Sequence, residues 1–342
     1  MNRNTLRLLG FAVALLLIAL WLVESGDEHA LPESGTVLLP DMKAVANDVD
    51  RVTISRAGEE PVVLVRESGK WQVPARDDYA ADVTRISKVL LAMVDAKVVE
   101  AKTTNPQRFG RLGVDAPTAA DSKGILVSAS AGDANFALIF GNVAQRNYRY
   151  ARIAGEDQAW LIDQNPDLPA AAGDWLEAGI IDIDATRVRS VEITHPDGQH
   201  ISIGKAAEED ANFEVRDIPP GRELSYSTVA NGIGGALNDL ELDDVRVAVD
   251  DDDREVVTAV YETFDDLRIV ARTIKADDGI WLSLSADALG DAPAKAEEIA
   301  SKVAGWQYRI ADYKGNLLRR RWEDILKEPA SKEGPEPGSD PN

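Results

Sequence analysis

The sequence predicts an α+β protein: two tandem copies of an antiparallel β-meander plus helix unit, preceded by one N-terminal transmembrane helix. Three observations predict this class. A long apolar run lies near the N-terminus, apolar residues alternate at a spacing of two from residue 51 onward, and the same pattern returns about 140 residues later. The resulting plan is a transmembrane anchor over 1–24, a linker over 25–36, copy one over 37–178, copy two with a C-terminal closing helix over 179–326, and a disordered tail over 327–342.

The anchor is predicted from an apolar run of sixteen residues at 8–23. As a helix the run is about 24 Å long, close to the bilayer core of about 30 Å. Arg3 and Arg7 precede it, and Asp27 and Glu28 follow it, so the positive-inside rule places the rest of the chain outside the cytoplasm. A cleaved signal peptide is the alternative, but bulky side chains end the run where a signal peptidase requires small ones.

Copy one begins with the alternating segments "RVTISR", "PVVLVR" and "KWQV". They predict a three-stranded antiparallel meander. The following stretch, "YAADVTRISKVLLAMVDA", has apolar residues at helical spacing and predicts a helix that packs on the meander. The predicted packing stripe consists of Val83, Ile86, Leu90, Met93 and Val94.

Copy two repeats this pattern without a gap in the first hairpin. The alignment sets Val52 on Val191, Ile54 on Ile193, Val62 on Ile201 and Leu64 on Ile203. "KWQV" then matches "NFEV", and a helix is expected to begin at "SYSTVANGIGGALNDL". Further on, "NYRYARIAGEDQAWLID" matches "LRIVARTIKADDGIWLSLS", which sets Trp160 on Trp281. An internal duplication explains these matches. The alternative is a shared β-rich architecture without duplication.

Two of the three histidines, His195 and His200, flank the stretch "PDGQ", and the third, His29, lies in the linker. "HPDGQ" is typical of a three-residue hairpin loop, which would pair Ile193 with Ile201. Successive side chains of a strand point to opposite faces, so the two imidazoles are not expected to converge on one metal ion. They are interpreted as surface decoration of a turn.

Three further motifs resemble sites but lack a required feature. Ser202 and Lys205 match S-x-x-K, yet they lie in a strand pattern that separates them. The run Asp250 to Asp253 lacks the glycine and glutamate of a calcium loop and reads as a solvated turn. The glycines of residues 232–235 lack the dinucleotide fingerprint and indicate close packing against another backbone, or a partner interface. No catalytic, cofactor-binding or metal-binding residue is predicted.

The composition restricts the classes of function. With 59 acidic and 37 basic residues the net charge is −22, which disfavours binding to nucleic acid. The sequence contains no cysteine, so disulfides, thiolate metal sites and a cysteine nucleophile are excluded. Apolar residues make up 44% of the chain, enough for each copy to bury its own core.

The C-terminal stretch "NLLRRRWEDILK" predicts one helix that closes copy two. Its apolar stripe is Leu317, Leu318, Trp322, Ile325 and Leu326. Burial of Trp322 is expected, with the neighbouring arginines near acidic loops. The alternative is a partner contact made by Arg319, Arg320, Arg321 and Trp322.

The layout resembles the bacterial domain-of-unknown-function family 4340. The features that carry the resemblance are the N-terminal anchor, "GKWQV" before a helix, "FGRLGVDAPTA", "NYRYARIAGEDQAWLID" and a late "WQYRIADY". The resemblance implies an accessory role beside ABC-type export permeases and gliding-motility-like auxiliary proteins, and it supplies no catalytic residues. Copy two has no equivalent of "FGRLGV".

These observations favour a non-enzymatic, single-pass accessory or scaffold subunit of a membrane complex, associated with an ABC-type transporter. The expected location is the bacterial inner membrane, with most of the chain periplasmic, and no cofactor is expected. Two alternatives stay open. One is an envelope hydrolase that uses a carboxylate pair, and the other is a tethered ligand-binding protein with a cleft between the copies.

Overall fold

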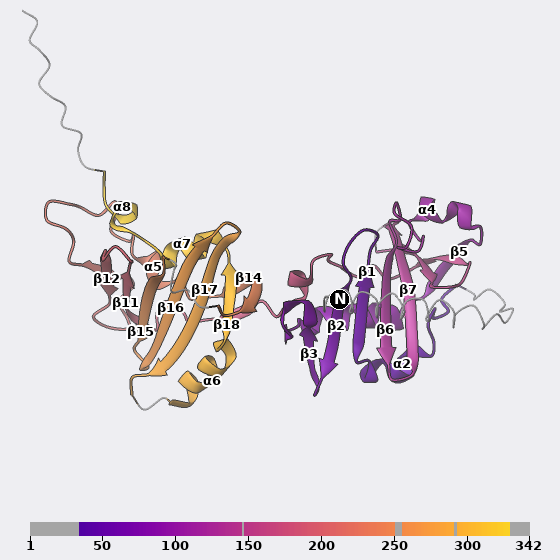
Figure 1. The fold of residues 1–342 in the computed structure, drawn as a ribbon, viewed down its shortest axis with the longest axis horizontal. Coiled ribbons are helices and arrows are strands. Elements are labelled where there is room, and N and C mark those ends of the chain that lie inside the picture. The colour runs from indigo at the N-terminus through magenta and orange to yellow at the C-terminus, as the bar shows by residue number, and fades with distance from the viewer. Residues whose placement is uncertain (1–33, 146, 250–254, 291–292, 329–342) are drawn as a thin grey trace, which may run out of the picture. The chain divides into compact units, whose positions relative to one another are not determined.

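The computed structural model describes residues 34–145, 147–249, 255–290 and 293–328. They form two compact units that divide between Glu177 and Ala178. Each unit is built on a nine-stranded antiparallel sheet with a few helices (Figure 1). The chain is therefore mostly β-sheet with some helix, in agreement with the coarse α+β prediction.

Several predictions concern residues outside the described ranges. These are the anchor over 1–24, the linker up to residue 33 with His29, the turn at residues 250–253 and the tail from residue 329. Within the described ranges, none of the helices has the length and apolar character needed to cross a bilayer.

The first unit orders its strands β4-β3-β2-β1-β6-β7-β8-β9-β5 across the sheet. The strands are β1 (Arg51–Ser55), β2 (Val62–Glu67), β3 (Lys70–Val73), β4 (Tyr79–Ala80), β5 (Val98–Thr103), β6 (Ile125–Ala131), β7 (Ala134–Val143), β8 (Arg149–Ile153) and β9 (Ala159–Ile162). The helices are α2 (Met42–Val45), α3 (Val83–Val94) and α4 (Phe109–Leu112), with 3-10 turns η1 (Ala46–Asp48), η2 (Pro74–Arg76), η3 (Pro106–Arg108) and η4 (Ala172–Trp175).

The second unit orders its strands β10-β14-β18-β17-β16-β15-β11-β12-β13. The strands are β10 (Gly179–Ile181), β11 (Val188–Thr194), β12 (His200–Gly204), β13 (Glu214–Arg216), β14 (Leu240–Val247), β15 (Val257–Thr263), β16 (Leu267–Ala276), β17 (Gly279–Ala288) and β18 (Trp306–Ile310). The helices are α5 (Asn231–Gly234), α6 (Pro293–Val303), α7 (Asp312–Leu318) and α8 (Trp322–Ile325).

The first hairpin of each unit has the register that its apolar alternation predicts. Ile54 pairs with Val62 in the first unit. The predicted pairing of Ile193 with Ile201 in the second unit is confirmed. All four side chains are buried, because alternation directs them to the core face of the sheet.

Both sheets are threaded in the same way. The central strands β1, β6, β7, β8 and β9 occupy the places of β11, β15, β16, β17 and β18, and β5 occupies the place of β14. By this order, the hairpin β8–β9 corresponds to β17–β18. The predicted match of Trp160 with Trp281 is therefore wrong by one strand: β9 corresponds to β18, which follows β17 only after helix α6.

In each unit, residues that follow the last strand return to the chain just before the helix that follows the meander. We call these residues, 169–176 in the first unit and 320–326 in the second, the closing segment. In the first unit the backbone N–H of Asp82 donates to the carbonyl of Trp175 at 2.8 Å, and Ala81 bridges Leu176. In the second unit the N–H of Ser225 donates to the carbonyl of Ile325 at 2.9 Å. The closing segment is thus held by matching bonds in both units.

The helices differ more from expectation. Helix α3 forms as predicted, and the side chain of Asp82 caps it by accepting from the N–H of Arg85 at 3.0 Å. The helix expected from residue 225 is reduced to the single turn α5, since glycine weakens a helix by about 1 kcal/mol per residue. The predicted C-terminal helix is also wrong, because it breaks at residues 319–321 into α7 and α8.

Candidate functional site

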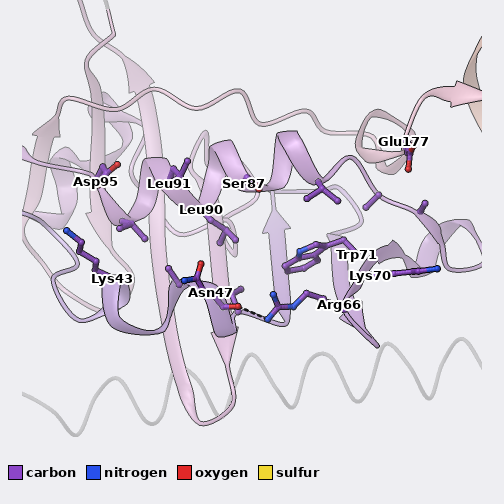
Figure 2. Close-up of a pocket in the computed structure, with 17 residues that line it drawn as sticks. Lys43, Asn47, Arg66, Lys70, Trp71, Ser87, Leu90, Leu91, Asp95 and Glu177 are labelled. Carbon is purple, nitrogen blue, oxygen red and sulfur yellow. Dashed lines mark hydrogen bonds between the residues drawn. The ribbon is translucent and has the colours of Figure 1, made fainter. Parts of the chain in front are cut away.

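An open groove of about 930 Å³ lies in the first unit. Helix α3 forms one side, and strands β2 and β3 with the α2–η1 segment form the other (Figure 2). The residues that line the groove include Lys43, Asn47, Arg66, Lys70, Trp71, Val83, Ser87, Leu90, Leu91, Val94, Asp95 and Glu177.

The α3 side of the groove is apolar and exposed. Val83 is 55% exposed and Leu91 is 58% exposed, and Leu90 is half-buried. Of the stripe predicted to pack on the meander, Ile86 and Met93 are buried as expected. The prediction is wrong for Val83, which is exposed, and only partly right for the half-buried Leu90. Helix α3 therefore carries more apolar surface than its own sheet covers.

The opposite side of the groove is cationic. Lys43 and Lys70 are exposed, and Arg66 lies over the ring of Trp71 at 5.8 Å from its centroid. The Arg66 guanidinium also donates to the carbonyl of Asn47 at 2.9 Å, which fixes its position. Three positive charges thus border an apolar floor in a chain of net charge −22. We call these three residues, Lys43, Arg66 and Lys70, the cationic lip.

The two carboxylates of the groove lie far from each other. Asp95 and Glu177 stand at opposite ends of it (Figure 2). Elsewhere, the described carboxyl groups with a shifted pKa are Asp184, Asp197, Glu223, Asp265 and Asp278, and each pKa is lowered. Hydrogen bonds from neighbouring donors lower them, in the case of Asp265 against an opposing effect of burial.

The two histidines of the hairpin are placed apart, and one of them is not surface decoration. His195 is only 4% exposed, and its Nε2 lies 3.0 Å from the carbonyl oxygen of Arg320, so Nε2 carries the donated proton. His200 is exposed and lies near Thr194 and Glu192. The surface interpretation is wrong for His195, because a closing segment distant in sequence covers it.

We expect His195→Ala to lower the free energy of unfolding by about 1–3 kcal/mol, since it leaves a buried carbonyl without its donor. His200→Ala is expected to stay within about 0.5 kcal/mol of the wild type, as exposed substitutions do. Urea denaturation of both single variants checks this. Equal losses in the two variants would show that the His195 bond contributes nothing.

The residues of the C-terminal basic cluster have separate surroundings. Arg319 donates to the carbonyl and hydroxyl of Thr273 at 2.6 and 3.0 Å, and burial lowers its pKa. Arg321 donates to Asp197 at 2.6 Å, and this bond lowers the pKa of Asp197. Trp322 is half-buried rather than buried. Two of the three arginines are thus engaged within the second unit.

The remaining sequence motifs lie in the packed second unit. Lys205 is buried, donates to the carbonyl of Ala185 at 3.1 Å and lies 4.6 Å from the ring centroid of Phe213, while Ser202 is also buried. A Cβ added at Gly234 would lie 2.2 Å from the ring of Phe213. The predicted close packing of the glycine segment is therefore present, but a side chain rather than a backbone makes it.

Sequence reasoning missed a set of buried arginines in the first unit. Arg149 donates to the carbonyls of Gly141 at 2.7 Å and Pro166 at 3.2 Å, and Arg152 donates to that of Val114 at 3.0 Å. Burial lowers the pKa of both arginines. A charged side chain in a strand normally indicates solvent exposure, and only the tertiary structure supplies the carbonyl acceptors.

Comparison with known proteins gives one match. A family model described as "Domain of unknown function (DUF4340)" matches residues 71–259. No curated protein and no solved structure matches the chain. The matched region begins at Trp71 on the floor of the groove and extends into the second unit.

Proposed function

This chain belongs to the DUF4340 family, and we propose that it is a non-enzymatic accessory or scaffold subunit of a membrane complex. The observation that carries the proposal is the groove of the first unit. Its exposed leucine and valine side chains and its cationic lip are the features of a surface that binds another molecule. Monomeric proteins rarely expose a large contiguous apolar patch, and a groove lined along a whole helix by such side chains favours a binding role.

We further propose that the subunit is single-pass and sits in the bacterial inner membrane with most of the chain in the periplasm. The apolar run at residues 8–23 and its flanking charges support this topology. The family resemblance supports an ABC-type transporter as the complex. Repulsion from nucleic acid by the net charge of −22 agrees with a protein partner.

The two units are proposed to be products of a tandem duplication. The support is the common order of β1, β6, β7, β8 and β9 with β11, β15, β16, β17 and β18. Residues aligned by sequence also make matching contacts. Arg56 donates to the carbonyl of Pro169 at 3.3 Å, and His195, its aligned residue, bonds the carbonyl of Arg320. Both contacts fasten the closing segment to the first hairpin.

Crosslinking in membranes followed by affinity purification of the full-length chain tests the proposal. An ABC-type permease or its auxiliary subunit is expected to co-purify, and intact mass should show that residues 1–24 are retained. A control chain carries a cleavable signal sequence in place of those residues. Recovery of the chain alone would overturn the accessory role, and a mature start near residue 25 would overturn the anchor.

A further inference from the structure

The groove is a departure from a plan that both units share. In each unit, a cation at the end of the second strand lies over the aromatic ring of the third. Arg66 lies over Trp71, and Lys205 lies over Phe213. Each cation also donates to a carbonyl in the loop before the first strand, that of Asn47 in one unit and that of Ala185 in the other. The floor of the site is therefore built alike in both units.

The two units differ in the helical segment that lies beside this site. Gly234 of α5 presses against the ring of Phe213, which is 3% exposed. Leu91 and Gly234 each follow the matching bonds of Asp82 and Ser225 by nine residues. Leu91 is 58% exposed. The ring of Trp71 is itself buried, at 8% exposed, so the units differ in the helical segment beside the ring: the first unit carries the exposed Leu91 where the second has a glycine.

The two units also differ in the segment that precedes the first strand of the meander. In the second unit, residues 182–187 lead directly from β10 to β11, and Ala185 comes within 3.8 Å of the position a Cβ would take at Gly235. In the first unit, residues 38–50 include α2 and η1, which form a separate wall of the groove. The longer segment before β1 thus supplies a wall of the groove that the second unit lacks.

The α3 wall has the pattern of a helix-packing face. Its groove residues Val83, Ser87, Leu90, Leu91 and Val94 recur at helical spacing along all of the helix. Such a row accepts the side chains of a second helix laid alongside it. Recognition of an amphipathic helix in an apolar groove uses anchors with this same spacing.

The charges around the groove indicate the kind of helix. The cationic lip runs along the side opposite α3 (Figure 2). Asp95 and Glu177 stand only at the ends. A helix lying in the groove would place one edge against Lys43, Arg66 and Lys70, where acidic side chains are favoured and basic ones repelled.

We propose that the groove of the first unit binds an amphipathic helix of a partner protein, with the apolar face of that helix on α3 and its acidic edge on the cationic lip. The inference deepens the proposed function, since it names the surface through which an accessory subunit would hold its complex, and it rests on that function for the partner's identity.

Binding of a labelled helical peptide to the purified full-length chain tests the inference. The probe is a peptide of about 18 residues, longer as a helix than α3, with leucines at helical spacing and glutamates along one edge. Its controls are a scrambled peptide of the same composition and a peptide with lysines in place of the glutamates. Fluorescence anisotropy measures the affinity of each.

Two groove variants and one matched control carry the test. Leu91→Glu and the double change Lys43→Glu with Lys70→Glu are each expected to weaken binding of the glutamate peptide at least about tenfold. The double variant is expected to bind the lysine peptide better than the wild type does, because the charge pattern is exchanged. Leu289→Glu alters a 42% exposed leucine of the second unit and is expected to leave binding unchanged.

Three results would overturn the inference. One is equal binding of the scrambled and designed peptides, and another is binding that survives both groove variants. The third is displacement of the designed peptide by a short-chain phosphatidylglycerol below its micelle concentration, which would assign the groove to an anionic lipid. Failure of the function looks different. If the chain purifies without a permease but shows this pattern of peptide binding, the groove proposal stands and the accessory function fails. If the Leu91→Glu variant retains a permease as well as the wild type does, the accessory function stands and the groove is not its docking surface.

Discussion

Trp175→Ala is expected to lower the free energy of unfolding of the first unit by about 3–5 kcal/mol. The side chain is 0% exposed, and its indole N–H donates to the carbonyl of Pro169 at 3.3 Å. Its backbone carbonyl accepts from Asp82 at the start of α3. Removal of the ring opens a cavity where the closing segment meets α3, so the closing segment should loosen from the sheet.

Hydrogen exchange measured at increasing urea, with peptides assigned to each unit, checks this expectation. Trp175→Phe is the matched control, because it keeps most of the ring volume and loses only the indole donor, so a smaller loss is expected. Exchange in peptides from residues 178–328 should not change. A loss below about 1 kcal/mol, typical of surface substitutions, would show that the closing segment does not stabilise the unit.

The hairpins were predictable because their signals are local. In the stretch from Ile193 to Ile201, alternation and a turn motif both specify one register, and a slip by one residue would turn the apolar side chains to solvent. The second hairpin match failed for a physical reason as well. Strands β16, β17 and β18 present similar alternation, and sequence similarity cannot choose between neighbouring pairs of strands in one sheet.

The helices and the groove were less predictable, because their form depends on what covers them. The one-turn α5 follows from the glycines of residues 232–235, because each glycine weakens a helix and together they shorten the helix expected there. The groove had a signal in the run from Val89 to Val94, where nearly every side chain is apolar. A stripe that wide exceeds the face that one sheet can bury, so part of it had to face something else.

Long-range polar contacts were outside the reach of sequence reasoning. His195 appears in a turn, and only the closing segment, more than a hundred residues later, makes it a buried donor. Arg149 and Arg152 lie in strands where charge normally indicates solvent. Their acceptors are backbone carbonyls, which leave no trace in the identity of any residue.

In the second unit, Leu318→Ala is expected to cost about 2–5 kcal/mol. Leu318 is 0% exposed at the end of α7. Trp322, whose burial was expected from the sequence, is only half-buried. Trp322→Ala should therefore cost less than Leu318→Ala. Urea denaturation with exchange resolved for residues 178–328 measures both, and the reverse order would restore the sequence-based expectation.

The arginines that follow Leu318 provide the second half of this experiment. Arg319→Gln is expected to cost about 1.5–3 kcal/mol, because a charged donor to Thr273 is lost from a half-buried site. Changing Arg319, Arg320 and Arg321 together to glutamine should therefore destabilise the unit rather than leave it unaltered. A triple variant that is fully stable but no longer co-purifies with a membrane partner would assign these residues, with Trp322, to docking instead. Salt separates the two roles. An exposed docking charge is screened over about 8–10 Å at physiological salt, so its effect on binding should weaken as salt rises. The half-buried Arg319 contact is screened much less, so its effect on stability should persist.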